Sequence, residues 1–288
     1  MHHPTLGSLF AGIGGFDLGF ERAGWRTAWQ VEIDPFCRAV LEHHFPGAQR
    51  RGDIRDCGAK NLRRVACITA GFPCQDISAS GNSAGRANRF GFSGARSGLV
   101  HEALRVIREL RPTWVVFENV EGLLHRPLLS DMQTLIQSLA GIGYLGCWRV
   151  LDARYFGIPQ RRRRVFVVGG FGRFPPMELL FDAGPVEPVS SSFDPEPIAR
   201  GADGWPGYTL QALNSPSRIT LGGELFVAEE NGWGAMVERA RAAAVHGLCL
   251  GLAPADSLSA QCAGNAVCPQ VAEWIARKLL AVECGDKL

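Results

Sequence analysis

Residues 6–16 read Leu6-Gly-Ser-Leu-Phe-Ala-Gly-Ile-Gly-Gly-Phe16, a short apolar run that leads into a glycine-rich turn. The apolar run predicts a strand over Leu6–Phe10. The spacing after the turn predicts a helix over Phe16–Ala23, ended by Gly24, and a second strand over Thr27–Val31. A strand, a tight turn, a helix and a second strand are typical of the first unit of a parallel sheet.

The alternation of strands and helices continues to about residue 170. Further strands are predicted over Val65–Ala70, Thr113–Phe117, Leu145–Leu151 and Val165–Val168. Further helices are predicted over Pro35–Phe45, Leu99–Leu110 and Leu128–Leu139. The pattern predicts a doubly wound α/β domain with a mainly parallel sheet, which we place at residues 1–171.

The character of the sequence changes after Gly169. Seven of the 17 prolines lie between residues 174 and 206, so regular structure should be sparse there. Beyond this region the sequence predicts short β-like pieces at Arg218–Leu221 and Leu225–Val227 and helices over Met236–Val245 and Val267–Val282. We therefore expect a small, irregular domain at residues 172–236, and C-terminal helices at residues 237–288 that return to the first domain.

The composition is that of a globular chain. Of its 288 residues 46% are hydrophobic and 20% charged, and no apolar run approaches the roughly 20 residues of a membrane helix. Nine cysteines without a Cys-x-x-Cys pair indicate reduced thiols, and Met1-His-His-Pro4 does not resemble a secretion signal. We expect a cytoplasmic monomer with no membrane partner and no resident metal.

Charge is distributed unevenly along the chain. The net charge is +2, but residues 1–175 carry +9 and residues 176–288 carry −7. Of the 30 basic residues 27 are arginine, whose planar fork suits phosphates and the edge of guanine. A GC-rich genome would give the same excess of arginine. The asymmetry is therefore the stronger indication of a polyanionic partner, contacted mostly by the first half of the chain.

Three features near predicted strand ends indicate a nucleoside-containing cofactor. The glycine turn would let a ligand approach the backbone, and the helix after it offers N–H groups to an anion. Glu32, after the second strand, is placed to bond both hydroxyls of a ribose, and Asp53 could accept a bond from an adenine amino group. The turn has neither the dinucleotide pattern nor a P-loop lysine. Each feature alone could be structural, but their order together favours the cofactor.

Two residues at strand ends could carry chemistry. Cys74 follows the third strand in Gly71-Phe-Pro-Cys-Gln-Asp-Ile-Ser78, at the edge where open α/β sheets place their sites. A thiol near helix N–H groups and arginine can be a thiolate, which is the nucleophilic form. Glu118 ends the fourth strand, would lie near Cys74 if the two strands are parallel neighbours, and could act as an acid toward a substrate nitrogen. The alternative for Cys74 is a buried structural cysteine.

Two further motifs lie on either side of the segment 165–262. The run Gln160-Arg-Arg-Arg-Arg164 enters a strand, where alternation would send Arg162 and Arg164 to one side and Arg161 and Arg163 to the other. At most two of these arginines can then serve one site, and an isolated run is more often a solvated turn. Asn265, in Ala263-Gly-Asn-Ala-Val267, could be the cap of the last helix.

The chain resembles the C5-cytosine DNA methyltransferases in five motifs that occur in the family's order. They are Leu9–Phe16, Gly71–Gln75, Glu118–Val120, Gln160–Arg164 and Gly264–Val267. The resemblance spans residues 6–170 and again about 236–284. It implies a Rossmann-like methyltransferase sheet with a small target-recognition domain, S-adenosyl-L-methionine as cofactor and double-stranded DNA as partner. It also implies a bacterial or phage-encoded protein of the restriction-modification type.

The resemblance further implies a role for each motif residue. Cys74 would attack C6 of the target cytosine, Glu118 would protonate or hydrogen-bond N3, and Arg164, with Arg162, would hold the base and orient Glu118. The base would be flipped out of the duplex, because C6 is otherwise stacked and out of reach. C5 would take the methyl group before the C5 proton and Cys74 leave. Phe10 would stack on the adenine of the cofactor. The other residues that would bind the cofactor are Gly12, Gly14, Gly15, Phe16, Glu32, Ile33, Asp53, Ile54, Pro73, Asn265 and Val267.

The DNA contacts implied by the resemblance come from two regions. The segment Ser78–Leu99 resembles the family's mobile loop and holds five glycines and no acidic residue. The small domain would read the sequence, although residues 176–235 carry nine acids and only Arg200 and Arg218 as bases. The expected DNA contacts are Gln75, Ser78, Arg86, Arg89, Arg96 and Arg218.

Three alternatives share this sequence pattern. A tRNA cytosine-C5 methyltransferase is the first, although the chain lacks the Cys-Phe-Thr tripeptide typical of that branch. A catalytically silent DNA-binding homologue is the second, and the joint presence of Cys74, Glu118 and Arg164 argues against it. The third keeps the fold but transfers a modified group from an altered cofactor, which nothing in the sequence indicates.

Overall fold

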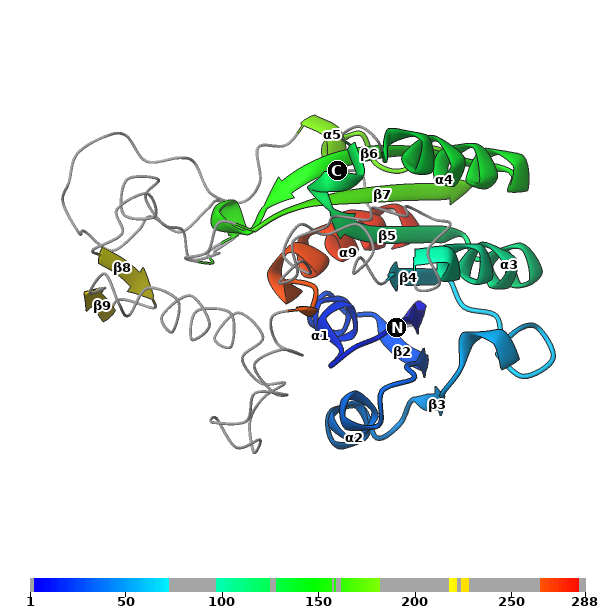
Figure 1. Ribbon diagram of the computed structural model, residues 1–288, viewed down its shortest axis with the longest axis horizontal. Coiled ribbons are helices and arrows are strands. Elements are labelled where there is room, and N and C mark those ends of the chain that lie inside the picture. The colour runs from blue at the N-terminus through cyan, green and yellow to red at the C-terminus, as the bar shows by residue number, and fades with distance from the viewer. Residues whose placement is uncertain are drawn as a thin grey trace, which may run out of the picture.

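The computed structural model describes residues 3–72, 97–124, 128–156, 158, 162–181, 218–221, 224–227 and 265–284. A seven-stranded sheet, in the order β3-β2-β1-β4-β5-β7-β6, forms the centre of the molecule (Figure 1). Its strands are β1 (Thr5–Leu9), β2 (Arg26–Val31), β3 (Gln49–Arg51), β4 (Cys67–Gly71), β5 (Trp114–Val120), β6 (Tyr144–Asp152) and β7 (Arg163–Phe171).

The first five strands are parallel, and β7 runs antiparallel to both of its neighbours, β5 and β6. Helices cover both faces of the sheet, as the alternation of strands and helices predicts (Figure 1). They are α1 (Gly15–Arg22), α2 (Pro35–His44), α3 (Val100–Leu110), α4 (Leu129–Ile142), α5 (Glu178–Phe181) and α9 (Pro269–Cys284). The strand order reverses between β1 and β4. In a doubly wound sheet such a point is where ligands bind, at the carboxyl ends of the strands.

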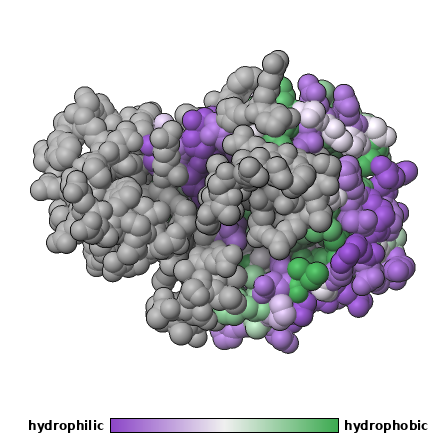
Figure 2. Space-filling model, viewed as in Figure 1, coloured by the Kyte–Doolittle hydropathy of each residue, from purple (hydrophilic) through white to green (hydrophobic). Residues whose placement is uncertain are grey.

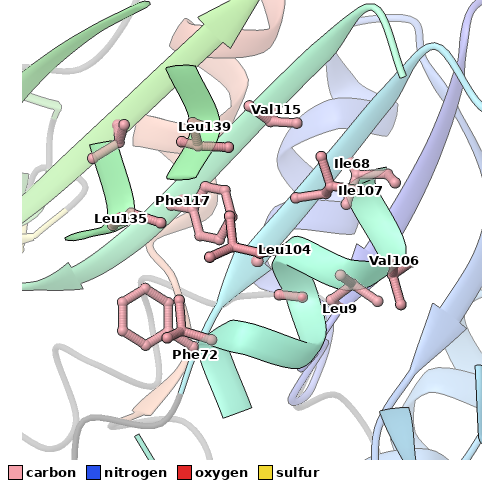
Figure 3. Packing of buried hydrophobic residues seen from close by; sticks show 14 of the residues in the cluster. Leu9, Ile68, Phe72, Leu104, Val106, Ile107, Val115, Phe117, Leu135 and Leu139 are labelled. Carbon is pink, nitrogen blue, oxygen red and sulfur yellow. The ribbon is translucent and has the colours of Figure 1, made fainter. Parts of the chain in front are cut away.

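The hydrophobic core lies in two layers, one on each side of the sheet. On one side α3 and α4 bury residues such as Leu104 and Leu135 against Phe117 of β5 (Figure 3). On the other side α1 and α9 bury Phe20 and Leu279. Each fully buried side chain of this size stabilises the fold by about 1.5–3 kcal/mol relative to exposure. The described surface is mostly hydrophilic on the face shown in Figure 2.

The last helix packs closely against the first one. A Cβ atom at Gly15 would lie 2.2 Å from the carbonyl oxygen of Val267, and one at Gly19 would lie 2.5 Å from that of Pro269. Glycine at both positions therefore allows the backbone of the C-terminal segment to touch α1. Residues far apart in sequence are in this way brought beside the glycine turn.

Several element boundaries differ from the sequence-based prediction. Strand β1 ends at Leu9, because Phe10 has a positive φ of 54°, which a strand does not accommodate. Strand β7 begins at Arg163, inside the arginine run. Helix α9 begins at Pro269, where proline suits the first turn, so Val267 and Cys268 precede it. The short edge strand β3 was not predicted, because its three residues, Gln49–Arg51, are polar.

Two further strands form a small hairpin. Strands β8 (Arg218–Leu221) and β9 (Glu224–Val227) pair antiparallel, at the positions of the two β-like pieces predicted from sequence. The predicted helix over residues 236–245 lies outside the described residues. No helix in the described part of the chain is both long and apolar enough to cross a membrane.

Candidate active site

The glycine turn between β1 and α1 presents backbone N–H groups at the carboxyl end of the sheet. Phe10, Gly12 and Gly14 all have positive φ, and the amide of Gly14 donates to the carbonyl of Ala11 at 2.9 Å. Gly14 is the N-cap of α1, and no side chain caps that helix. The first amides of α1 are therefore available to a bound ligand, and the helix dipole favours a negative group there.

Glu32 fastens this turn from the end of β2. One carboxylate oxygen, Oε2, accepts a hydrogen bond from the amide of Gly12 at 2.8 Å, and Oε1 accepts one from the amide of Asp34 at 2.9 Å. Each oxygen keeps a further lone pair for a ligand hydroxyl. Ile33, the next residue, is 63% exposed, which is unusual for a large apolar side chain. The predicted pair Glu32 and Ile33 thus offers a carboxylate and an uncovered apolar surface side by side.

Asp53 lies after β3, the strand that pairs with β2 in the sheet. Its carboxylate caps the short helical turn Ile54–Asp56 and is held by the side chain of Arg55. These hydrogen bonds hold the pKa of the Asp53 carboxyl below its usual value of 3.8. The side chain of Ile54 is buried in the core, so a ligand in this place can meet only the backbone of Ile54.

A second group of residues gathers where β4, β5 and β7 meet. Glu118 pairs in register with Gly71 at the end of β4 and is only 7% exposed. Arg164 of β7 lies opposite Val120 of β5. Its Nε atom is 3.2 Å from Oε1 of Glu118. The parallel pairing of β4 and β5 that the sequence predicts is confirmed. It brings Gly71, the last residue of β4, beside Glu118.

Arg162 connects the Glu118 region to the C-terminal segment. Its Nη2 atom donates to the carbonyl of Ala266 at 2.8 Å, and its backbone amide donates to Asp152 at 3.3 Å. Arg162 and Arg164 line one small pocket together with Glu118, whereas Arg163 pairs with Glu121 at 2.7 Å. For these three arginines the structure has the alternation expected on entry into a strand.

The rest of that pocket is apolar. Phe166, Val271 and the buried thiol of Cys268 contribute to its wall, together with Leu151 and Ala153. Burial raises the pKa of Cys268 above its usual value of 9.0, so this thiol stays protonated. The cavity has a volume of only about 10 Å³, room for about one water molecule, and its apolar wall faces the Glu118–Arg164 pair.

The structure corrects the role expected for Asn265. Helix α9 begins at Pro269, four residues later, so Asn265 is not its cap. Val267 is buried and packs against Gly71 at the end of β4, while its carbonyl contacts Gly15. Phe16 is likewise buried, against Phe20 and Phe166. Val267 and Phe16 are therefore buried next to Gly71, between the glycine turn and the Glu118–Arg164 pair.

Asn119 was not assigned a role from sequence. It is buried, and its Nδ2 atom donates to the carbonyl of Phe72 at 3.2 Å. Asn119 thus fixes the backbone two residues before Cys74. The sequence did contain a signal for this role. Asn119 follows Glu118 on the same strand, and because neighbouring strand residues point to opposite faces, it had to serve a different purpose from Glu118.

A buried polar network under the glycine turn was also missed. Asp17 of α1 is fully buried and accepts a hydrogen bond from Gln30 at 3.0 Å, while Thr69 donates to Ser8 at 3.3 Å. Burial, the largest cause, raises the pKa of Asp17 to about 7. Polar residues on strands that are otherwise apolar were the available signal.

Several predicted site residues lie outside the described residues. They are Pro73, Cys74, Gln75, Ser78, Arg86, Arg89 and Arg96. Of Arg218 the structure describes the backbone on β8. No cluster of three or more possible metal-binding side chains occurs within the described ranges.

Comparison with known proteins identifies the family. The C-5 cytosine-specific DNA methylase family matches residues 5–173. Type II methyltransferase M2.BsuMI of Bacillus subtilis is 37% identical over 185 residues, which cover 63% of this chain and 45% of that protein. Type II methyltransferase M.XorII of Xanthomonas oryzae is 36% identical over 181 residues, which cover 59% and 41%. The chain thus spans less than half the length of these relatives.

Among solved structures, the S. pombe Dnmt2 methyltransferase has a similar fold. It superposes with a TM-score of 0.61 over 97% of this chain and 99% of that chain, at 15% sequence identity. This likeness concerns the Rossmann-like fold alone. The family match covers more than half of the chain and includes the glycine turn, Glu32, Asp53, Glu118 and the arginine run. The chain therefore belongs to the C-5 cytosine-specific DNA methylase family.

Proposed function

We propose that this protein transfers a methyl group from S-adenosyl-L-methionine to C5 of cytosine in double-stranded DNA. One observation carries the proposal: the ion pair of buried Glu118 and partly exposed Arg164 lies beside the end of β4, three residues before Cys74. A carboxyl group, a guanidinium and a thiol are the groups that addition to a cytosine ring requires. Membership of the family supports the same reaction.

The residues at the other group of strand ends fit the cofactor. The uncapped start of α1 can receive the carboxylate of a methionine moiety, and Glu32 retains acceptor sites for ribose hydroxyls. Exposed Ile33 and partly buried Phe10 offer apolar surface to an adenine, and Asp53 is an acceptor for its amino group. Gly12, Gly14, Gly15, Ile54, Pro73, Asn265 and Val267 complete the proposed cofactor set. When bound, S-adenosyl-L-methionine supplies a methyl group on a positively charged sulfur.

The reaction would begin at Cys74. Its thiolate adds to C6 of the cytosine, and Glu118 donates a proton or a hydrogen bond to N3, so that negative charge does not build up in the ring. Arg164 holds Glu118 in place, and Arg162 ties the same strand to the segment at Ala266. After C5 has taken the methyl group, loss of the C5 proton and expulsion of Cys74 restore the ring and the thiol.

Contacts to DNA are proposed from two parts of the chain. Gln75, Ser78, Arg86, Arg89 and Arg96 would meet the backbone and the flipped nucleotide, and residues 172–236 would read the sequence. Arg218, on β8 of the hairpin, is the residue we expect to reach a base edge, because arginine is suited to guanine. Methylation of a randomised duplex pool by Arg200→Ala and Arg218→Ala tests this. An unchanged sequence profile in both variants would contradict it.

Sequencing of methylated cytosines tests the proposed reaction itself. DNA from cells that express the protein should carry 5-methylcytosine at one recognition sequence, and DNA from cells with Cys74→Ala should not. A parallel assay with purified protein compares duplex DNA with tRNA as the acceptor. Methylation of tRNA alone would contradict the proposal and would favour the RNA-directed branch of the family.

A further inference from the structure

The carboxylate of Asp53 is fully occupied by a single neighbour, Arg55. Oδ1 accepts hydrogen bonds from the backbone amide of Arg55 at 2.9 Å and from its Nε at 3.0 Å. Oδ2 accepts from the same Nε at 3.0 Å and from Nη2. A carboxylate offers about four acceptor positions, and Arg55 uses them all.

The backbone around this pair is held by α3. Arg105 donates from Nη2 to the carbonyl of Ile54 at 3.0 Å and forms ion pairs with Glu102 and Glu109 on its own helix. Glu109 in turn accepts a hydrogen bond from the amide of Ala59 at 2.9 Å. The turn after Asp53 is thus anchored at two points. The hydrogen bonding of the Asp53 carboxylate can therefore change by movement of a side chain, while the backbone stays in place.

The side chain of Arg55 is free to make that change. It is 65% exposed, whereas the side chain of Asp53 is 24% exposed. Exposed ion pairs are weak, because water and salt screen them. The backbone bond from Arg55 to Oδ1 belongs to the capped turn and is independent of the guanidinium. Rotation of the Arg55 side chain would therefore release Oδ2 first and leave the turn intact.

We propose that Arg55 competes with the adenine amino group for Asp53 and acts as a side-chain gate on the adenine subsite. The inference rests on the proposed function, in which Asp53 receives that amino group. An amino N–H needs an open lone pair on the carboxylate, and Arg55 covers Oδ2 until it swings away. The Asp53–Arg55 pair therefore lowers the affinity for the cofactor by the free energy needed to break it. Breaking an exposed pair corresponds to a factor of about two to five in affinity.

The test measures binding of S-adenosylhomocysteine by calorimetry, at low and at high salt. This ligand has no charged sulfur but keeps a carboxylate and an ammonium, so the contribution of the Asp53–Arg55 pair is the difference in salt dependence between the wild type and Arg55→Ala. Arg55→Ala should bind it about two- to five-fold more tightly than the wild type at low salt. The wild type should approach the affinity of this variant as salt rises, because screening weakens the pair. Arg55→Met, which keeps the apolar stem, should behave like Arg55→Ala.

Two controls isolate the contact with Asp53. Arg51→Ala removes an exposed arginine two residues before Asp53 and should leave the affinity unchanged. In an Asp53→Ala background, Arg55→Ala should have no further effect. Equal or weaker binding by both Arg55 variants would overturn the gate and would indicate that Arg55 supports the adenine. If the wild type and every variant fail to bind S-adenosylhomocysteine, the proposed cofactor itself is wrong, and the gate falls with it.

Discussion

The Nε atom of Arg164 on β7 lies 3.2 Å from Oε1 of Glu118 on β5, and the two strands are antiparallel neighbours. Glu118 is almost fully buried, so its carboxyl group needs a polar partner such as Arg164. Because β5 also pairs with β4 in parallel, the same carboxyl lies beside the end of the strand that leads to Cys74. One sheet thus brings a carboxyl, a guanidinium and the approach to a nucleophile together.

Glu118→Gln should slow methyl transfer by about 10²- to 10⁴-fold, the usual contribution of a positioned acid. Binding of S-adenosylhomocysteine should stay the same, because we propose that Glu118 contacts the cytosine and not the cofactor. Single-turnover methylation of duplex DNA measures the rate. The matched control is Glu121→Gln, which removes the carboxylate that pairs with Arg163 on the same two chain segments. An equal loss of rate in both variants would show a structural effect and not an acid at Glu118.

Glu32→Ala should weaken binding of S-adenosyl-L-methionine by about 1–3 kcal/mol, the usual effect of leaving hydrogen bonds to a charged group unmade. The carboxylate holds the amides of Gly12 and Asp34, so its loss also loosens the glycine turn. Isothermal calorimetry measures the affinity, with Glu42→Ala, an exposed acid on α2, as control. Unchanged affinity in Glu32→Ala would refute its assignment to the cofactor.

Gly15→Ala should destabilise the protein by about 1–3 kcal/mol, because a Cβ atom there would overlap the carbonyl of Val267. Gly141→Ala is the matched control, since Gly141 also lies in a helix but has nothing within 4 Å of the added atom. There alanine should stabilise the protein by about 0.5–1 kcal/mol through helix propensity. Urea unfolding of both variants measures the two effects. A Gly15→Ala protein as stable as the wild type would contradict the close packing of α1 on the C-terminal segment.

Asp17 should make stability depend on pH. Burial raises the pKa of its carboxyl from 3.8 to about 7 in the folded protein, so the folded state holds a proton that the unfolded chain releases above pH 4. This contribution is present at low pH and is lost as pH rises to about 7. Between pH 5 and pH 8 Asp17→Asn should therefore gain about 2–3 kcal/mol relative to the wild type. Urea unfolding of both proteins at the two pH values measures the difference, and parallel pH profiles would contradict it.

The order of strands and helices in the first 171 residues follows from local patterns and could be predicted from the sequence. The glycine turn, the apolar strands and Pro35 at the first turn of α2 each act within a few residues. The contact of Arg162 with Ala266 spans 104 residues and could not be predicted in this way, because it depends on how α9 returns to α1. The Asp53–Arg55 pair is local in sequence, but the geometry that occupies both oxygens emerges only from the folded turn.

The family resemblance supplied roles that local patterns could not. Cys74 is one of nine cysteines, and no spacing rule alone distinguishes it from the buried Cys67 or Cys268. Glu118 and Arg164 are 46 residues apart and become neighbours only when β7 is inserted beside β5. The possible role of Asn265 as the cap of the last helix was wrong, because proline at 269 sets the start of α9.

The most direct measurement of the proposed reaction is covalent trapping on a duplex that carries 5-fluorocytosine in the recognition sequence. Fluorine at C5 cannot leave as a proton, so the adduct between Cys74 and C6 should accumulate once the methyl group has been transferred. A denaturing gel should show a protein–DNA complex that depends on S-adenosyl-L-methionine and that is absent for Cys74→Ala, while Cys284→Ala, which removes an exposed thiol, still forms it. A complex that persists in Cys74→Ala, or its absence in a wild-type protein that methylates the ordinary duplex, would contradict the account.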